Sequence, residues 1–258
     1  MSTVLYEVKN HIAYITLNRP EALNALNREL SRDLAETWYR FDADEDAWIA
    51  ILTASGRAFC AGADLKDRAG DEERPPGPSL SLGHGIDIYK PIIVGVHGHC
   101  LAAGIDLVLP CDIRVAAEDA NFGMTMTRWG VMASTGASQL PRAIHWPHAM
   151  EMLLTAERIS AQEAYRIGLV NRVVPGDQLL AACEEYAAKI LRNSPTAVRL
   201  TKEAAIRGRD SATMAESLKV GFSLQRMMKT TPDASEGPRA FVEKREPKWT
   251  PTDVGGVH

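Results

Sequence analysis

The sequence predicts an α/β fold: short buried strands alternate with helices, and a purely helical part follows at the C-terminus. A β-branched apolar run at residues 92–96 leads directly into small residues and then into a helical segment. From Pro195 onward the pattern is helical throughout, and Met214, Leu218 and Phe222 recur on one helix face. A helical tail without its own sheet needs a surface to pack on. We therefore expect a core over 1–194 and a helical domain over 195–258.

The N-terminal elements follow from local patterns. Val4–Val8 and Ile12–Leu17 flank Lys9-Asn10-His11, which predicts a β-hairpin. Asn27 is a favourable N-cap, and a helix over about 28–43 then carries a stripe of apolar residues with a 3.6-residue period: Leu30, Leu34, Trp38 and Phe41. Trp48–Leu52 is expected to be a buried strand that ends in a turn at Ser55-Gly56.

The middle of the chain contains one clear loop and a series of short elements. Residues 67–79 are charged and then rich in Pro and Gly, which is typical of a loop: either a flap over a site or a solvated surface segment. The remaining elements are expected in this order: a helix near 81–89, strands at 92–97, 113–117 and 121–123, helices near 137–144, 147–155 and 161–167, a strand at 170–174, and helices at 177–192 and 211–229. Ser160 is the expected N-cap of the helix at 161–167.

Two stretches share one design: a strand, a turn of small residues, and the start of a helix. They are Ala58–Lys66 (AFCAGADLK) and His97–Asp112 (HGHCLAAGIDLVLPCD). The first N–H groups of a helix have no intrahelical partner and favour negative charge. Small side chains let a ligand oxygen approach such groups closely. Donors from the two turns are therefore expected to converge on one oxygen as an oxyanion hole.

Composition excludes several functional classes. The net charge of −4 provides no global basic field for nucleic acid. The four cysteines form no C-x-x-C pair, and the histidines form no metal-spaced set, so we expect free thiols and no metal site. No apolar run reaches 18 residues, and MSTVLYEVKNH lacks a signal-peptide core. A cytoplasmic protein with neither a membrane nor a nucleic-acid partner is expected.

Together the two turns resemble those of the crotonase, or enoyl-CoA hydratase/isomerase, family. NRPEALNALN at 18–27 is similar to the family's CoA-wrapping segment; further similar segments are CDIRVAAEDANFG at 111–123, LTAERISAQEAYRIGLVNRVVP at 154–175 and SEGPRAFVEKREPKW at 235–249. The resemblance implies a spiral of β-β-α turns over 1–194 and a helical trimerisation domain over 195–258. It also implies a homotrimer or a dimer of trimers, and an acyl-CoA substrate. No cofactor is expected to be bound permanently, since CoA enters as part of the thioester.

By position in the family pattern, the oxyanion donors are the N–H groups of Ala63 and Ala103. They would hold a thioester carbonyl while it becomes an enolate, and one such donor is typically worth ~3–4 kcal/mol in the transition state. The family's Gly-Gly-Gly turn is here Ala102-Ala103-Gly104. We expect the added methyl groups to narrow the pocket and to prevent a strongly left-handed backbone.

Family hydratases use two glutamates, and this chain keeps at most one acid. Asp106 stands at the first position and Met126 at the second; Ser134 stands where some isomerases have aspartate. Asp is shorter than Glu by a C–C bond of ~1.5 Å, and a ~1 Å misplacement can cost about a hundredfold in rate. Asp106 is either a single general base that also orients water, or a helix-capping carboxylate. Among the histidines, His99 is the one most expected to face the pocket.

The resemblance also implies substrate contacts. The CoA moiety is expected against two backbone segments, with Ala22, Leu23 and Ala25 in the first and Ala61, Ala63, Asp64, Leu65 and Lys66 in the second. Met126 and Trp129, with Met124, would form the acyl pocket beside Ala103, although core packing explains them equally well. On the C-terminal helix, Phe241 and Lys244 resemble the family's adenine-end and phosphate-end contacts.

Three functions remain open. The first is an enoyl-CoA hydratase/isomerase homologue, of the hydro-lyase class, with an atypical acid/base set. The second is a decarboxylase, C–C hydrolase or double-bond isomerase acting on an unusual acyl-CoA, which needs fewer protein acids. The third is a non-catalytic CoA-binding protein that has lost its acids.

Overall fold

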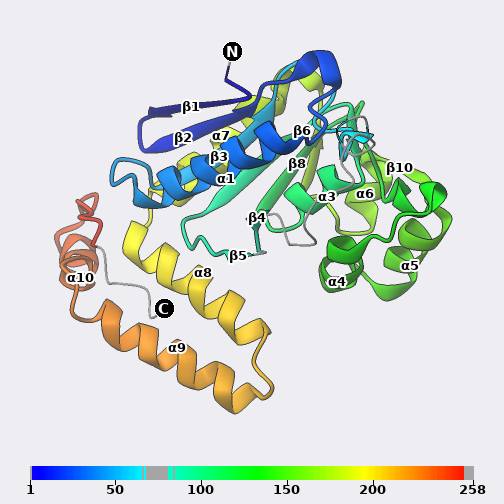
Figure 1. Ribbon diagram of the computed structural model, residues 1–258. Coiled ribbons are helices and arrows are strands. Elements are labelled where there is room, and N and C mark those ends of the chain that lie inside the picture. The colour runs from blue at the N-terminus through cyan, green and yellow to red at the C-terminus, as the bar shows by residue number, and fades with distance from the viewer. Residues whose placement is uncertain (1, 66, 68–80, 84, 253–258) are drawn as a thin grey trace. The chain divides into compact units, whose positions relative to one another are not determined.

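The computed structural model describes residues 2–65, 67, 81–83 and 85–252 (Figure 1). The chain divides into two compact units, the first comprising Met1–Asp87 with Ile92–Tyr186 and the second Ile88–Pro91 with Ala187–His258. The division falls inside a helix, α7 (Leu179–Leu191), and not at the expected boundary of 194/195. The assignment of separate roles to the two parts stays a prediction.

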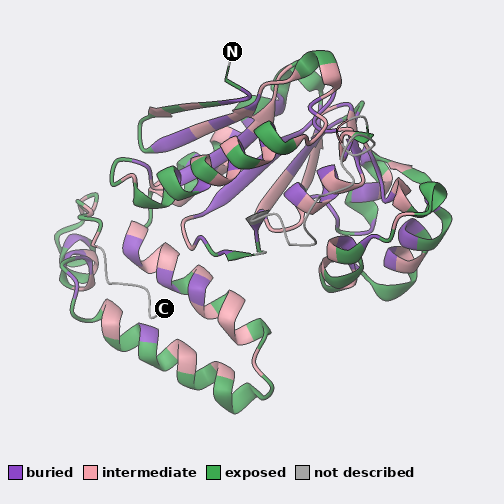
Figure 2. Ribbon diagram, viewed as in Figure 1, coloured by how far each residue is buried: buried purple, intermediate pink, exposed green. Residues whose placement is uncertain are grey.

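The first unit is built on a six-stranded sheet in the order β1-β2-β3-β6-β8-β11. Its first two strands form the predicted antiparallel hairpin, and every later pairing is parallel. The strands are β1 (Val4–Lys9), β2 (Ile12–Leu17), β3 (Ile49–Ala54), β6 (Ile92–Val96), β8 (Ile113–Ala117) and β11 (Arg172–Val174). Most of the central strand residues are buried, as Figure 2 shows in purple.

Helices cover both faces of this sheet. Helix α1 (Arg28–Ala43) begins at the predicted N-cap, where the Asn27 side chain accepts a hydrogen bond from the Leu30 N–H. Its predicted apolar stripe is buried, and Figure 1 shows the helix across the front of the sheet, with α7 behind. A methyl group on Gly95 of β6 would lie 3.1 Å from the Cys183 sulfur of α7. Glycine on β6 therefore lets that helix pack closely against the sheet.

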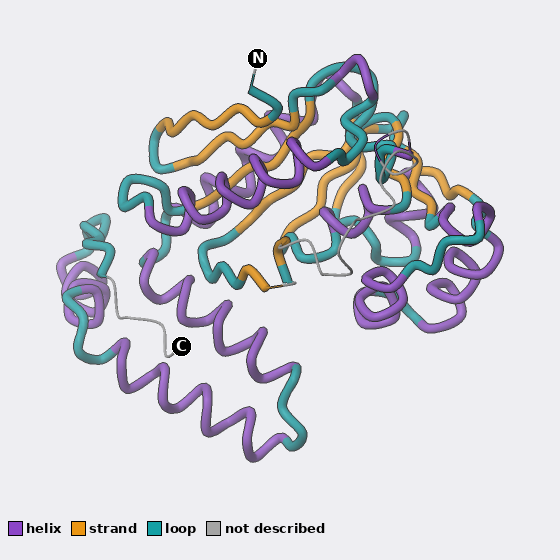
Figure 3. Tube along the Cα trace, in the orientation of Figure 1, coloured by secondary structure: helices purple, strands orange, loops and turns teal. Residues whose placement is uncertain are grey.

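A second, three-stranded sheet in the order β10-β9-β7 carries the small-residue turns (Figure 3). It consists of β7 (His99–Leu101), β9 (Asn121–Gly123) and β10 (Arg158–Ser160). Helix α3 (Ala103–Val108) starts directly after β7. The helical elements that follow β9 are η2 (Thr125–Trp129), α4 (Ser134–Ala143), α5 (Trp146–Thr155) and α6 (Ala161–Arg166), the last capped by Ser160 as predicted.

The predicted helix near 81–89 is wrong. The described part of this segment forms two short parallel strands, β4 (Ser81–Leu82) and β5 (Gly85–Ile86). Gly83 and Gly85 both adopt positive φ, which a right-handed helix cannot contain. Of the loop predicted over 67–79, all residues but Asp67 lie outside the described ranges, as does His84.

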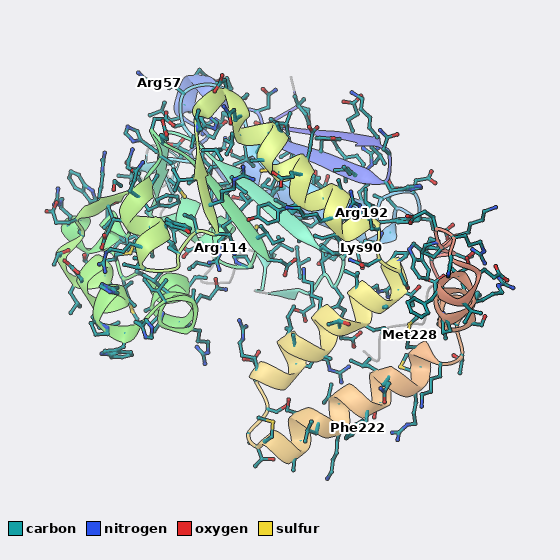
Figure 4. The ribbon with its side chains drawn as sticks, turned by 180° about the vertical axis from the view of Figure 1, so that it is seen from behind. Arg57, Lys90, Arg114, Arg192, Phe222 and Met228 are labelled. Carbon is teal, nitrogen blue, oxygen red and sulfur yellow. The ribbon has the colours of Figure 1, made fainter. Side chains whose placement is uncertain are left out.

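The second unit contains the three helices predicted by the C-terminal pattern: α8 (Pro195–Arg209), α9 (Met214–Met228) and α10 (Asp233–Glu243). Thr213 and Glu216 form a capping box at the start of α9. Leu224 of α9 is buried, whereas the stripe residues Met214, Leu218 and Phe222 are exposed (Figure 4 labels Phe222 on this helix). Among the helices that the structure describes, none has the length and apolar character needed to span a bilayer.

Candidate active site

The two small-residue turns lie side by side, as the sequence predicts. The Phe59 N–H donates to the His97 carbonyl, the Cys60 N–H donates to the His99 carbonyl, and the Leu101 N–H returns to the Cys60 carbonyl, each at 2.9 Å. A methyl group on Gly62 would come within 3.0 Å of the Ala102 Cβ and 3.6 Å of the Ala103 nitrogen. The first turn therefore packs directly against the start of α3.

Neither the Ala63 N–H nor the Ala103 N–H donates a hydrogen bond to another described residue. The Leu26 N–H donates to the Gly62 carbonyl at 2.8 Å, and the Asp64 N–H donates to the Leu26 carbonyl at 3.0 Å. Since successive backbone groups of an extended segment point to opposite sides, the Ala63 N–H points away from Leu26. Ala103 is the first residue of α3, where an N–H has no intrahelical acceptor. Within the described ranges, neither amide donates a hydrogen bond.

The second turn has a backbone conformation that the sequence analysis wrongly excluded. Ala102 adopts φ 50° and ψ −118°, a positive-φ conformation despite its methyl group. Its N–H donates to the Gly123 carbonyl at 2.8 Å, and its carbonyl accepts from the Ile105 N–H at 2.9 Å. Such a conformation in a residue other than glycine costs about 1–3 kcal/mol and persists only where the surroundings enforce it. The strand β9 and the first turn of α3 enforce it here.

Asp106 has the features of a reactive carboxyl group. It lies on α3, and its Oδ1 atom is fully buried with no hydrogen-bond partner in the described part of the chain. Burial raises the pKa of Asp106 to about 6. A helix-capping role would satisfy the carboxylate with backbone N–H groups, so the unpartnered oxygen does not support that interpretation.

Gly136 lets Met124 pack beside the carboxyl group of Asp106. A methyl group on Gly136 of α4 would lie 3.3 Å from Asp106 Oδ1 and 2.0 Å from the Met124 Cε. Met124 itself is completely buried. The carboxyl group and an apolar methionine therefore border the same space.

Within the described ranges, three residues have buried side-chain polar atoms without partners: Asp106, Arg114 (Nε and Nη1) and Gln139 (Oε1). Arg114 lies on β8 (Figure 4), and burial lowers its pKa. Asp106 is the one carboxylate in this set. An unpaired buried carboxylate is costly and typical of a functional position.

Among the described histidines, none has a fully buried ring nitrogen without a hydrogen-bond partner. His99 of β7, the expected pocket residue, has its Nδ1 3.0 Å from the Asn121 Oδ1 on the neighbouring strand. The partly buried His97 has its Nε2 2.9 Å from the Gly56 carbonyl oxygen. Met126 lies in η2 and is partly buried, and Ser134 begins α4 and is exposed.

The proposed CoA-wrapping segment is brought against the first turn. The Ala61 N–H donates to the Leu23 carbonyl at 3.0 Å, so the segment with Ala22, Leu23 and Ala25 runs beside residues 61–64. Leu65 is exposed, and Lys66 lies outside the described residues.

Three further residues predicted to contact the substrate are exposed. Trp129 is 69% exposed at the end of η2, so it is not part of the core. Phe241 and Lys244 belong to the second unit, where both are exposed, on α10 and at its C-cap. Their contacts with CoA stay predictions.

Three residues of this region were not assigned a role from the sequence: Arg19, Asn24 and Gly136. Asn24 is fully buried, and its side chain donates to the Ser55 and Ala58 carbonyls. Arg19 forms an ion pair with Asp64. Both lie inside NRPEALNALN, a segment expected to contact CoA through its backbone. Their polar side chains were therefore the sequence signal for a structural role. In the portion of the chain that is described, no group of three or more His, Cys, Asp or Glu is arranged to hold a metal ion.

Comparisons with known proteins give the family and the fold of the chain. Residues 7–252 match the family described as enoyl-CoA hydratase/isomerase. The chain is 40% identical over 252 residues to an (E)-benzylidenesuccinyl-CoA hydratase of Thauera aromatica, covering 95% of this chain and 98% of that protein. It is also 40% identical over 252 residues to a mevalonyl-coenzyme A hydratase of Aspergillus fumigatus, covering 95% and 93%. A crystal structure of enoyl-CoA hydratase from Mycobacterium tuberculosis matches with a TM-score of 0.91 at 37% identity, covering 98% of this chain and 100% of that chain.

Proposed function

The chain belongs to the enoyl-CoA hydratase/isomerase family, and from this premise we propose that it is an acyl-CoA enzyme that stabilises a thioester enolate. The observation that carries the proposal is the convergence of two turns whose Ala63 and Ala103 amides have no acceptor among the described residues. A thioester carbonyl held there would receive two hydrogen bonds as negative charge accumulates on its oxygen. Donors fixed before the reaction stabilise that charge without reorganising.

In this proposal Asp106 is the acid/base group. For hydration of an enoyl thioester, the carboxylate accepts a proton from water while the water oxygen bonds to the β carbon. The displaced π electrons form the enolate, and the same carboxyl group then returns a proton to the α carbon. A pKa of about 6 suits both proton transfers near neutral pH.

A second candidate reaction is double-bond migration between the 3,4 and 2,3 positions of an enoyl thioester. Here one carboxylate removes a proton from the α carbon and returns it to the γ carbon, so no water and no second acid is required. The specific observation in its favour is the apolar Met124 beside Asp106, together with Met126 and Ser134 at the positions of the missing acids. Decarboxylation or C–C hydrolysis of an unusual acyl-CoA would use the same two amide donors.

A substrate panel tests these alternatives. Crotonyl-CoA and longer 2-enoyl-CoA esters report hydration by loss of enone absorbance, and 3-enoyl-CoA esters report isomerisation by its gain. Malonyl-type, β-keto and cyclic CoA esters test decarboxylation and C–C hydrolysis. Asp106→Asn keeps the shape of the side chain but removes the base, so it should abolish whichever activity is found. Tight acyl-CoA binding by calorimetry without turnover on any ester would instead indicate a non-catalytic CoA-binding protein.

We further propose that the chain assembles as a homotrimer or a dimer of trimers, in a reducing compartment such as the cytoplasm. Support for assembly comes from α9, whose apolar residues Met214, Leu218 and Phe222 are exposed in the single chain. Burying such a stripe is favourable at about 25 cal/mol per Å². Analytical ultracentrifugation of the wild type and of Phe222→Asp gives the test, because the charge should dissociate the assembly; a monomeric wild type contradicts the proposal. The support for the compartment is that all four cysteines are buried and none forms a disulfide in the described structure.

A further inference from the structure

An ion pair connects the CoA-wrapping segment with the first turn of the site. Arg19 Nη1 lies 2.7 Å from Asp64 Oδ2, and the two side chains are only 22% and 13% exposed. The same Nη1 donates to the Ala25 carbonyl at 2.9 Å. Arg19 therefore joins residue 25 of the segment to the residue that directly follows Ala63.

Other bonds already hold the segment in its place. Asn24 accepts from the Arg19 N–H at 2.8 Å and donates to the Ala58 carbonyl at 2.8 Å. The Leu26 N–H donates to the Gly62 carbonyl, and the Ala61 N–H donates to the Leu23 carbonyl. Because these bonds anchor the segment without the Arg19 side chain, the ion pair has its specific effect at Asp64.

The turn that contains Ala63 depends on contacts from outside. Gly62 adopts φ +102°, a conformation that few side chains tolerate, so the turn has little local preference of its own. Arg19, held by Asp64, binds the Ala25 carbonyl, which shares a peptide unit with the Leu26 N–H. That N–H donates to the Gly62 carbonyl, which shares a peptide unit with the Ala63 N–H, so the ion pair helps to hold the Ala63 amide in a constant direction.

We propose, on the premise of the enolate chemistry above, that Arg19 and Asp64 are a positioning pair that holds the Ala63 amide in the direction required by the thioester carbonyl. The pair touches neither the reacting carbons nor the carbonyl oxygen. Its effect is on the transition state, because a donor displaced by ~1 Å can lower the rate about a hundredfold. Loss of the pair should therefore lower kcat far more than it raises KM.

The test uses full-length Arg19→Ala, Asp64→Asn, the double variant and Arg19→Lys. Two properties are measured: steady-state kinetics on the best ester of the panel, and the absorbance of a bound aryl-acryloyl-CoA. Amide donors that polarise the thioester carbonyl shift this absorbance to longer wavelength, so the red shift reports the oxyanion donors without turnover. Lys9→Ala is the control, since it removes an ion pair of similar length, with Glu7 at 2.8 Å, that is exposed on β1 outside the site.

We expect each single variant to lower kcat about 10- to 100-fold with KM changed less than about threefold, and to reduce the red shift. The double variant should be no worse than the poorer single variant, because both remove one interaction. Arg19→Lys should restore part of kcat, since lysine supplies the charge but not the planar fork. Lys9→Ala should behave like the wild type.

Two results overturn the proposal by itself: variants that melt earlier but keep the wild-type kcat and red shift, or kinetic losses that add in the double variant. A wild type that shows the red shift without turnover contradicts the proposed reaction alone, and the pair is then judged from the red shift. A wild type with neither turnover nor red shift overturns both.

Discussion

Gly136 faces the carboxyl group of Asp106 so closely that a methyl group on its Cα would lie 3.3 Å from Oδ1. The same methyl group would overlap the Met124 Cε at 2.0 Å. The absence of a side chain at Gly136 therefore lets Met124 pack beside an unpartnered carboxyl oxygen. Since Asp106 is the proposed base, several properties of the site should respond to a change at this position.

Gly136→Ala should lower activity about 10- to 100-fold, because either Met124 or the Asp106 carboxylate must move, and small displacements of a catalytic group are costly. Overpacking of this kind costs about 1–3 kcal/mol of stability, less where a flexible methionine end moves aside. Kinetics and urea unfolding measure the two effects. Gly176→Ala is the control, since nothing lies within 4 Å of a methyl group there. Wild-type kinetics in Gly136→Ala would show that the rate does not depend on the positions of Met124 and the Asp106 carboxylate.

The activity should depend on pH through Asp106. If the carboxylate form is the base, kcat/KM should rise as pH increases through about 6, the pKa to which burial raises this group, and should then level off. Glu at this position reaches farther, so Asp106→Glu should keep a rise of this kind while changing kcat. Initial rates between pH 4.5 and 8 on one ester give the profile. A profile that is flat across pH 6 would assign the base to another group.

The same pKa predicts how stability changes with pH. In the folded state the pKa of Asp106 is about 6, against 3.8 for an unperturbed aspartate, so between these values the folded protein binds more protons than the unfolded chain. The free energy of unfolding therefore falls as pH rises from about 4 to 6. At pH 7 burial of the charged group costs about 2–3 kcal/mol.

Asp106→Asn removes this ionisation. Relative to the wild type, it should be stabilised by up to about 2 kcal/mol at pH 7, and the difference should shrink towards pH 4. Chemical unfolding of both proteins at several pH values measures it. An Asp106→Asn protein less stable than the wild type at pH 7 would mean that the ionised carboxylate has a partner in solution.

How much could be predicted from the sequence depended on how local the cause was. The N-caps at Asn27 and Ser160 and the hairpin turn at Asn10 act over a few residues, so they were predicted at or near their positions. The helix expected near 81–89 failed because Gly83 and Gly85 adopt positive φ, which apolar spacing does not report.

The site combines local and long-range causes. The small-residue turns and their convergence were expected from the sequence, but the backbone bridge between residues 60 and 100 that joins them was not. The Arg19–Asp64 contact joins residues 45 positions apart, and no periodicity or cap connects them. Burial of the Asp106 oxygen likewise depends on Gly136 of α4, which lies beside it only in the folded chain.

Ala102 provides the last prediction, because its strain is separate from the chemistry of Asp106. Its φ of 50° with ψ of −118° is allowed for glycine and costs about 1–3 kcal/mol for alanine. Ala102→Gly removes that cost but adds about 0.5–1 kcal/mol of backbone entropy to the unfolded chain. We expect a net stabilisation of about 1 kcal/mol, measured by urea unfolding.

Ala156→Gly is the comparator, since Ala156 adopts an ordinary left-handed conformation, φ 56° and ψ 19°, at the end of α5. Its gain should be smaller than that of Ala102→Gly, because the left-handed helical region is less costly to alanine than the conformation at 102. A destabilised Ala102→Gly would mean that the methyl group contributes packing worth more than the strain, through its contact with the turn at Gly62. In that case packing of the Ala102 methyl group stabilises the second turn. This packing would explain why alanine is tolerated at a position with positive φ.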